Sequence, residues 1–263
     1  MKKRTVFVSL SLLLLLASLP LLQADPKGEQ LVNQYLDQSA RRSAIFKMGV
    51  DYAEPGKEPI HLEFTWMRKS KQGLMSHLIK MEAPPSEKGK LLLVHEKPDG
   101  DSDYIAYRPN SALKKKVRIS GARNYKFKGL TISVQELIGG ELQKYDHQAK
   151  GMKQIDGIHC SEVENRIKQQ FKNDSNYPRS VAYFREDNGM LQKWELFGDS
   201  DKLEKVVTAD ELKKIQGNWT TIVARVEDLK KKGKLVLKLI EGQYDKSISD
   251  ELFNDNYLKQ NSK

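Results

Sequence analysis

The chain has 263 residues, a formal net charge of +10 and a single cysteine, Cys160. One cysteine excludes an intrachain disulfide, so the fold must rest on its hydrophobic core. The chain is long enough to build such a core as one large domain or two small ones. The lysine excess is spread along the chain, which is typical of a solvated surface but also suits anionic lipids or an acidic partner. No recognition motif supports nucleic-acid binding.

Residues 1–24 have the pattern of a cleaved secretory signal. A basic start, Lys2–Arg4, precedes the apolar run Val6–Leu22, and Ala24 supplies a small residue at the expected cut. The alternative is a membrane anchor, but a spanning helix needs about 20 apolar residues and this run is slightly shorter. We expect cleavage, and a mature chain beginning near Asp25 that is free in a compartment outside the cytoplasm. Cleavage would lower the net charge from +10 to +7, since the segment holds three basic residues and no acidic one.

The first element after this segment is predicted to be a helix. Leu31, Tyr35 and Leu36 recur at near-helical spacing, and no glycine or proline interrupts the stretch Glu29–Arg42. From Ala44 onward the pattern changes to strand candidates separated by turn residues.

Strands dominate the rest of the chain. Apolar and polar residues alternate over Ile60–Met67, which is the period of a half-buried strand. The turn Asp187-Asn188-Gly189 is a strong hairpin signal, because Asn and Gly tolerate the positive φ of tight turns. Further strands are expected at Leu74–Met81, Lys90–His95, Asp103–Tyr107, Lys114–Ile119, Gly140–Asp146, Gly157–Ile167, Tyr177–Arg185, Met190–Phe197, Leu203–Leu212, Asn218–Leu229 and Lys234–Tyr244.

Two short helices interrupt or close this series. Ser133–Ile138 reads as one, with Ser133 as a cap and Glu136 at the spacing of a capping box. Ser249–Leu258 reads as a closing helix. Strands at roughly ten-residue intervals, joined mostly by tight turns, predict a single antiparallel barrel or strongly curved sheet. Alternating βαβ units are absent, which argues against a doubly wound fold.

The sequence holds no recognisable catalytic constellation. No Gly-x-Ser-x-Gly elbow, phosphate-binding loop or His-Glu-x-x-His motif is present. His61, His77 and His95 lie on predicted strands where they could meet, but isolated strand histidines are usually surface or core residues. Cys160 is expected to be a buried structural thiol. We therefore assign no catalytic residue, no metal ligand and no cofactor; a hydrolase with an unrecognised site is a further alternative.

Large apolar side chains form the remaining candidate site. A barrel of this many strands is wide enough that side chains need not fill it, and the leftover space would suit acyl chains. The competing interpretation, an ordinary core, must hold for most of these residues, and the opposite strand face could point inward instead. The residues expected to line a lipid-binding cavity are Leu62, Phe64, Trp66, Met81, Leu93 and Trp194.

Several segments share a distinctive order. In Asp103–Pro109 a strand ends in an aromatic residue beside a proline and leads into the basic strand Lys114–Ile119. A glycine then precedes the short helix in Gly129–Leu137, a hairpin follows at Asp187–Leu191, and Ile248–Phe253 closes the chain. Together these segments resemble the outer-membrane lipoprotein-sorting protein family, which is related to the periplasmic lipoprotein carrier LolA.

The resemblance implies a mainly β (α+β) fold: a half-open antiparallel β-barrel wrapped around a few helices, with an apolar cavity between them. It implies one LolA-like lipid- or lipoprotein-binding domain over residues 25–263. Relatives bind the acyl chains of lipoproteins or other lipids, and some accompany RND-superfamily lipid exporters.

We therefore expect a non-enzymatic, monomeric periplasmic carrier or chaperone. It would deliver lipids or lipoproteins toward the outer membrane, or to or from an inner-membrane exporter, with Ser133–Ile138 or the N-terminal helix as a lid. The alternative is a periplasmic sensor or adaptor subunit that docks on an RND-type transporter or a signalling protein through its lysine-rich surface.

Overall fold

The computed structural model describes residues 25–97, 102–107, 117–118, 130, 132–138, 142–254 and 256–257. The expected signal segment, residues 1–24, lies outside this range, as do residues 114–116 and 119 of the predicted basic strand. None of the described helices is both long enough and apolar enough to span a bilayer.

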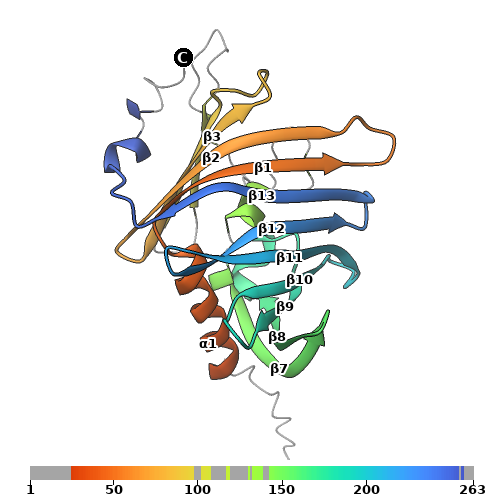
Figure 1. The fold of residues 1–263 in the computed structure, drawn as a ribbon. Helices are drawn as coiled ribbons and strands as arrows, with labels where there is room; N and C mark the ends of the chain where they lie inside the picture. Colours follow the sequence, from red (N-terminus) through yellow and green to blue (C-terminus); the bar gives the residue numbers. More distant parts are fainter. Residues whose placement is uncertain are drawn as a thin grey trace, which may run out of the picture.

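A single antiparallel sheet organises the described residues. Its 13 strands follow the order β6-β5-β4-β3-β2-β1-β13-β12-β11-β10-β9-β8-β7. The strands are β1 (Ala44–Ala53), β2 (Ile60–Lys71), β3 (Leu74–Ala83), β4 (Leu91–Glu96), β5 (Ser102–Tyr107), β6 (Val117–Arg118), β7 (Tyr145–Ile155), β8 (Ile158–Ile167), β9 (Arg179–Arg185), β10 (Leu191–Phe197), β11 (Leu203–Ile215), β12 (Asn218–Asp228) and β13 (Gly233–Tyr244). The sheet is strongly curved (Figure 1), and β6 and β7 stand at opposite ends of its order. This confirms the predicted half-open antiparallel barrel.

Tight turns join most neighbouring strands. Gln72-Gly73 connects β2 to β3 with φ values of 53° and 80°, and Gln216-Gly217 connects β11 to β12 with φ values of 49° and 80°. Two successive residues with positive φ give a turn whose twist matches that of the flanking strands. The predicted turn at Asp187-Asn188-Gly189 is also present, with Gly189 at φ 70° and its N–H donating to the Arg185 carbonyl.

The N-terminal helix is anchored to the sheet at its first turn. α1 (Pro26–Tyr35) continues into a π-helical segment, η1 (Leu36–Ala40). One carboxylate oxygen of Asp25 accepts from the Lys27 N–H at 3.0 Å, and the other accepts from the Ala149 N–H of β7 at 2.7 Å. The helix cap is therefore also a bond to the edge strand.

Gly28 allows this helix to lie close to β7. A Cβ atom added at Gly28 would stand 2.7 Å from the carbonyl oxygen of His147, closer than side-chain carbons approach backbone in proteins. Glycine is used where two backbones must meet at such distances.

The second helix forms as its cap predicts. α2 (Val134–Leu137) begins at Ser133, whose hydroxyl accepts from the Glu136 N–H at 3.2 Å. The Glu136 carboxylate in turn accepts from the Ser133 N–H at 2.5 Å, which completes the capping box.

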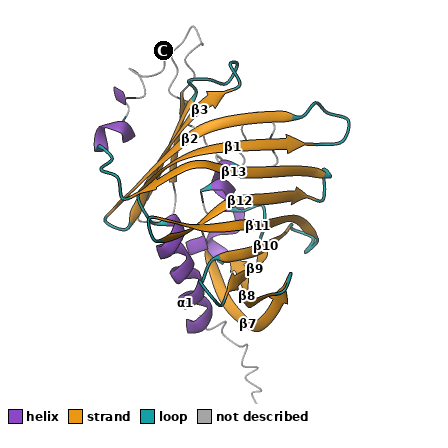
Figure 2. Ribbon diagram, viewed as in Figure 1, coloured by secondary structure: helices purple, strands orange, loops and turns teal. Residues whose placement is uncertain are grey.

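Both helices lie on the concave side of the sheet (Figures 1 and 2). They stand between its N-terminal wing, strands β1–β6, and its C-terminal wing, strands β7–β13. α1 and η1 pack through Val32 and Leu36 against the strands of the C-terminal wing. α2 and its flanks pack through Ile132, Val134 and Ile138 against the strands of the N-terminal wing. This arrangement confirms a barrel wrapped around helices.

The closing segment covers the outer face of the sheet. Ile248 and Phe253 pack against Leu78 and Leu93 there, and the Lys69 ammonium donates to the Ile248 carbonyl at 2.6 Å. Within the predicted closing helix Ser249–Leu258, Asp250–Phe253 form a 3₁₀ helix, η5, and residues 256–257 are helical again. Residues 255 and 258 of the predicted helix lie outside the described range.

One predicted strand is wrong in its placement. The described residues of Gly140–Asp146 hold a 3₁₀ helix, η3 (Leu142–Lys144), and only the first two residues of β7. The strand itself extends to Ile155. Most of β7 beyond His147 is exposed and polar, because it is an edge strand whose outer half no other described element covers. It therefore lacks the apolar alternation that marks half-buried strands.

Candidate functional site

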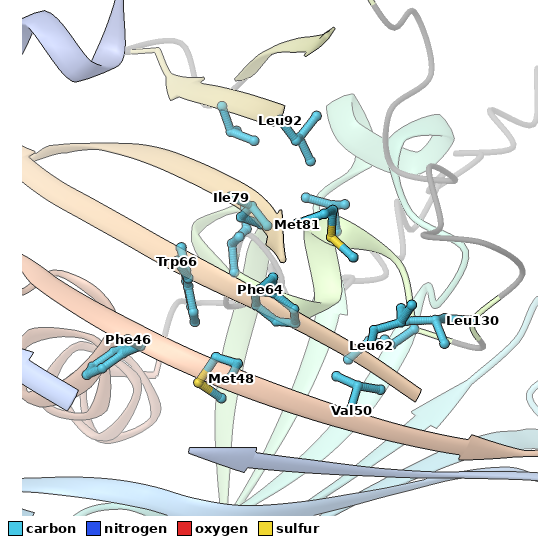
Figure 3. Packing of buried hydrophobic residues seen from close by; sticks show 14 of the residues in the cluster. Phe46, Met48, Val50, Leu62, Phe64, Trp66, Ile79, Met81, Leu92 and Leu130 are labelled. Carbon is cyan, nitrogen blue, oxygen red and sulfur yellow. The ribbon is translucent and has the colours of Figure 1, made fainter. Parts of the chain in front are cut away.

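Cross-strand register builds a continuous apolar surface on the concave face. Phe46 of β1 stands opposite Trp66 of β2, which stands opposite Ile79 of β3. In the next row, Met48 stands opposite Phe64. Figure 3 shows these side chains gathered above β1 and β2, with Leu130 beside Leu62. Period-two alternation thus places every second residue of three strands in one layer.

Beside this layer, the space between the helices and the sheet is only partly filled. A cavity of about 200 Å³ lies there. Its wall is mainly apolar, and Val207, Leu237 and Leu239 are only half-buried along it. It is lined by Tyr35 and Ser39 of the N-terminal helix, by Ile132, Glu136, Leu137, Ile138 and Leu142 around α2, and by Phe46, Met48, Trp66, Arg68, Ala182, Phe184, Met190, Leu191, Trp194, Lys205, Val207, Ala209, Trp219, Thr220, Thr221, Ala224, Val226, Leu237, Leu239 and Tyr244 of the sheet and its turns.

The six residues singled out from the sequence fall into three places. Trp66 and Trp194 line the cavity. Leu62, Phe64 and Met81 share the concave face, but they are buried in the solid core beside the cavity. Their role in lipid binding stays a prediction.

Leu93 points to the other side of the sheet. It is fully buried in the outer cluster beneath Phe253, while its neighbour Leu92 faces the concave core. Alternation along β4 requires this, because adjacent residues of a strand face opposite sides.

The sequence pattern did not single out Arg68, the most unusual residue of the cavity wall. It lies two positions after Trp66, so it shares the inward face, and only 5% of it is exposed. Its guanidinium carbon stands 4.8 Å from the centre of the Phe46 ring, 5.3 Å from Trp66 and 5.8 Å from Tyr244. One terminal nitrogen donates to the Ser39 carbonyl at the end of η1.

Burial lowers the pKa values of Arg68 and of its neighbour His77. Loss of solvation lowers the pKa of Arg68 to about 10, which still leaves it charged at neutral pH. Loss of solvation, together with the nearby Arg68 charge, lowers the pKa of His77 to about 3. His77 is therefore neutral, and its Nδ1 accepts from the Trp66 indole N–H at 3.3 Å. The spacing Trp66-x-Arg68 on a strand that begins in a clear apolar alternation is the only signal that could have revealed this cluster.

A second charged group joins α2 to the sheet. The Lys205 ammonium of β11 lies 2.5 Å from the Glu136 carboxylate, with the two side chains 2% and 11% exposed. The same ammonium stands 5.2 Å from the centre of the Tyr177 ring. Burial and the Glu136 charge raise the pKa of Tyr177. A carboxylate that caps α2 thus also fixes it to the cavity wall.

The histidines considered for metal binding stay apart. His61 is exposed and lies 2.7 Å from the Asp51 carboxylate, His77 is buried beside Trp66, and His95 meets the Ser76 hydroxyl at 2.9 Å. Among the residues that the structure describes, no group of three His, Cys, Asp or Glu side chains is arranged to hold a metal ion.

Comparisons with known structures identify the fold. A DUF1329 family protein from Desulfovibrio piger superposes with a TM-score of 0.80 at 23% identity, over 88% of this chain and 98% of that one. A putative outer membrane lipoprotein-sorting protein domain from Vibrio parahaemolyticus gives 0.79 at 19% identity, over 89% and 98%. A LolA superfamily protein from Nitrosomonas europaea gives 0.70 at 15% identity, over 88% and 98%. The protein therefore has the LolA-like fold that the sequence motifs implied.

The family of the chain is identified by a match to a protein-family model. A family model described as "-like: Uncharacterized protein" matches residues 73–260. This span is more than half of the chain, so the chain belongs to that family. No curated protein matches the sequence.

Proposed function

We propose that this protein is a non-enzymatic periplasmic carrier or chaperone for the acyl chains of lipids or lipoproteins. Residues 1–24 would be its cleaved signal, and residues 25–263 one LolA-like binding domain. The observation that carries the proposal is the partly filled apolar cavity between the helices and the concave face of the sheet. A fold whose helices do not fill its own concavity leaves room for a ligand.

The energetics favour an acyl chain as that ligand. Each methylene group that leaves water for an apolar interior contributes about 0.8 kcal/mol, so burial of part of one chain gives useful affinity. The half-buried Val207, Leu237 and Leu239 would lose their remaining contact with water on binding. Met48 and Met190 add flexible side chains that adapt to a chain of variable shape.

A ligand also needs an entrance, and Trp219 stands where one would be. It lines both the apolar cavity and a separate polar cleft, which Gln34, Arg42 and Asn188 also line. The two spaces thus meet at one side chain at the start of β12. We assign this side as the opening through which a chain would pass to a membrane or to an inner-membrane exporter.

A blocked cavity provides the test. Ala224 of β12 lines the cavity opposite Leu237, so Ala224→Trp would place an indole in the space proposed for the ligand. We expect this variant to bind palmitate at least about tenfold more weakly than the unaltered protein. Palmitate binding would be measured as the displacement of an uncharged naphthylamine fluorophore from delipidated protein.

The matched control is Val223→Trp. Val223 adjoins Ala224 on the same strand and pairs with the exposed Lys238, so its side chain points away from the cavity. Val223→Trp adds an indole of the same size outside the cavity and should leave palmitate affinity unchanged. Equal palmitate binding by the two variants and the unaltered protein would rule out this cavity as the site.

A further inference from the structure

One buried charge of the cavity wall has no opposite charge beside it. Arg68 is 5% exposed, and among the described residues no carboxylate lies within ion-pair distance of its guanidinium. A buried charge is costly unless it is paired and hydrogen-bonded. A ligand that brings a negative charge to this guanidinium would offset that cost.

The partners that Arg68 does have account for its position only in part. The Ser39 carbonyl, at the C-terminal end of the helix formed by α1 and η1, accepts one N–H, and the Tyr244 hydroxyl is a further hydrogen-bond partner of the guanidinium. The aromatic faces of Phe46 and Trp66 offer a weaker attraction to the cation. The Nε–H of Arg68 is buried and has no hydrogen-bond partner among the described residues.

A second unpartnered donor lines the same cavity. The indole Nε1 of Trp194 is buried without a partner among the described residues, and its side chain belongs to the cavity wall. His77, which packs beside Trp66, has an unpartnered Nε2; because its Nδ1 accepts from Trp66, the neutral ring carries its proton on Nε2. Buried donors without acceptors cost free energy, so their complement is a group rich in acceptor oxygens.

We propose that the cavity takes an amphiphile whose acyl chain ends in an anionic group, a carboxylate or a phosphate, and that Arg68 binds that group. This inference rests on the proposed function and narrows its ligand class. The acidic oxygens would accept from the Arg68 Nε–H, while the chain extends along the apolar wall that includes Met48 and Leu239. A guanidinium suits both head groups because its fixed N–H donors match the geometry of carboxylate and phosphate oxygens.

The test compares amphiphiles of one chain length with different heads: palmitate, hexadecyl phosphate and hexadecanol. Each displaces the naphthylamine fluorophore from delipidated protein at mildly alkaline pH. We expect the acidic ligands, or one of them, to bind about tenfold more tightly than hexadecanol, as a charge-assisted hydrogen bond allows. A preference for palmitate alone identifies a carboxylate head, and a preference for hexadecyl phosphate alone identifies a phosphate head.

The variant Arg68→Gln should abolish this preference, so that the acidic ligands bind no more tightly than hexadecanol. Arg225→Gln is the matched control, because Arg225 adjoins Ala224 on β12, points away from the cavity and is paired with Asp210 at 2.9 Å. It should keep the preference.

Three results would overturn the inference in different ways. Equal affinity of the unaltered protein for all three ligands removes the anionic site but leaves the carrier function standing. If Arg68→Gln lowers the affinity for all three ligands equally, the role of Arg68 is only to hold η1 against the sheet. Failure of every amphiphile to bind the unaltered protein rejects the carrier function itself.

Discussion

Replacing Lys205 by methionine is expected to lower the free energy of unfolding by about 3–5 kcal/mol, the usual cost of removing one partner of a buried ion pair. Lys205 is 2% exposed and lies 2.5 Å from the Glu136 carboxylate, which is 11% exposed. Methionine has similar volume, so the loss comes from the negative charge left buried on Glu136. Urea unfolding at neutral pH measures it.

Two further variants identify the cause. In Lys205→Met combined with Glu136→Gln, neither charge of this pair remains and the Gln side chain can still cap Ser133, so we expect much of the lost stability to return. Lys230→Met removes an exposed lysine, 3.8 Å from Glu204, and should change stability by less than about 0.5 kcal/mol. A Lys205→Met protein as stable as Lys230→Met would show that α2 is not held by this pair.

His77 is expected to make the protein sensitive to acid. Its pKa is about 3 in the folded protein against 6.5 for an ordinary histidine, because burial and the Arg68 charge disfavour the protonated ring. As pH falls below 6.5 the unfolded chain binds a proton that the folded chain refuses, so stability falls until the folded pKa is reached. The titration of His77 alone should lower the free energy of unfolding by about 2 kcal/mol between pH 7 and pH 5.

The variant His77→Gln isolates this effect. Glutamine does not titrate, and its carbonyl can accept from the Trp66 indole in place of Nδ1. Urea unfolding at the two pH values should show a smaller loss in the variant, by about 2 kcal/mol. His147, whose pKa is also lowered by burial, is present in both proteins and cancels. Equal losses in the two proteins would mean that His77 does not set the acid sensitivity.

Local patterns were enough to predict most of the fold. Alternation over Ile60–Met67 predicted β2, Asp187-Asn188-Gly189 predicted a turn, and the Ser133 capping box predicted α2, because each depends on residues close in sequence. β7 was misplaced because its exposed outer half has no apolar side to alternate.

The candidate site was harder to predict, because β4 and most of β5 are buried on both faces. Leu92 and Leu93 are 1% and 0% exposed, yet they belong to opposite sides of the sheet. The outer side is covered by the closing segment, through Ile248 and Phe253, a contact between residues far apart in sequence. The sequence pattern did not indicate Arg68, because a charged residue near a strand end is expected to be exposed unless the tertiary packing is known.

Native mass spectrometry of the protein purified from its own host tests the central claim most directly. We predict a mass above that of the polypeptide, with the difference released on denaturation as an acyl-chain lipid carrying an acidic head. The Ala224→Trp protein, prepared in the same way, should carry none. Unaltered protein that shows only the polypeptide mass, and takes up no palmitate when delipidated, would contradict the carrier function and favour an adaptor that binds other proteins.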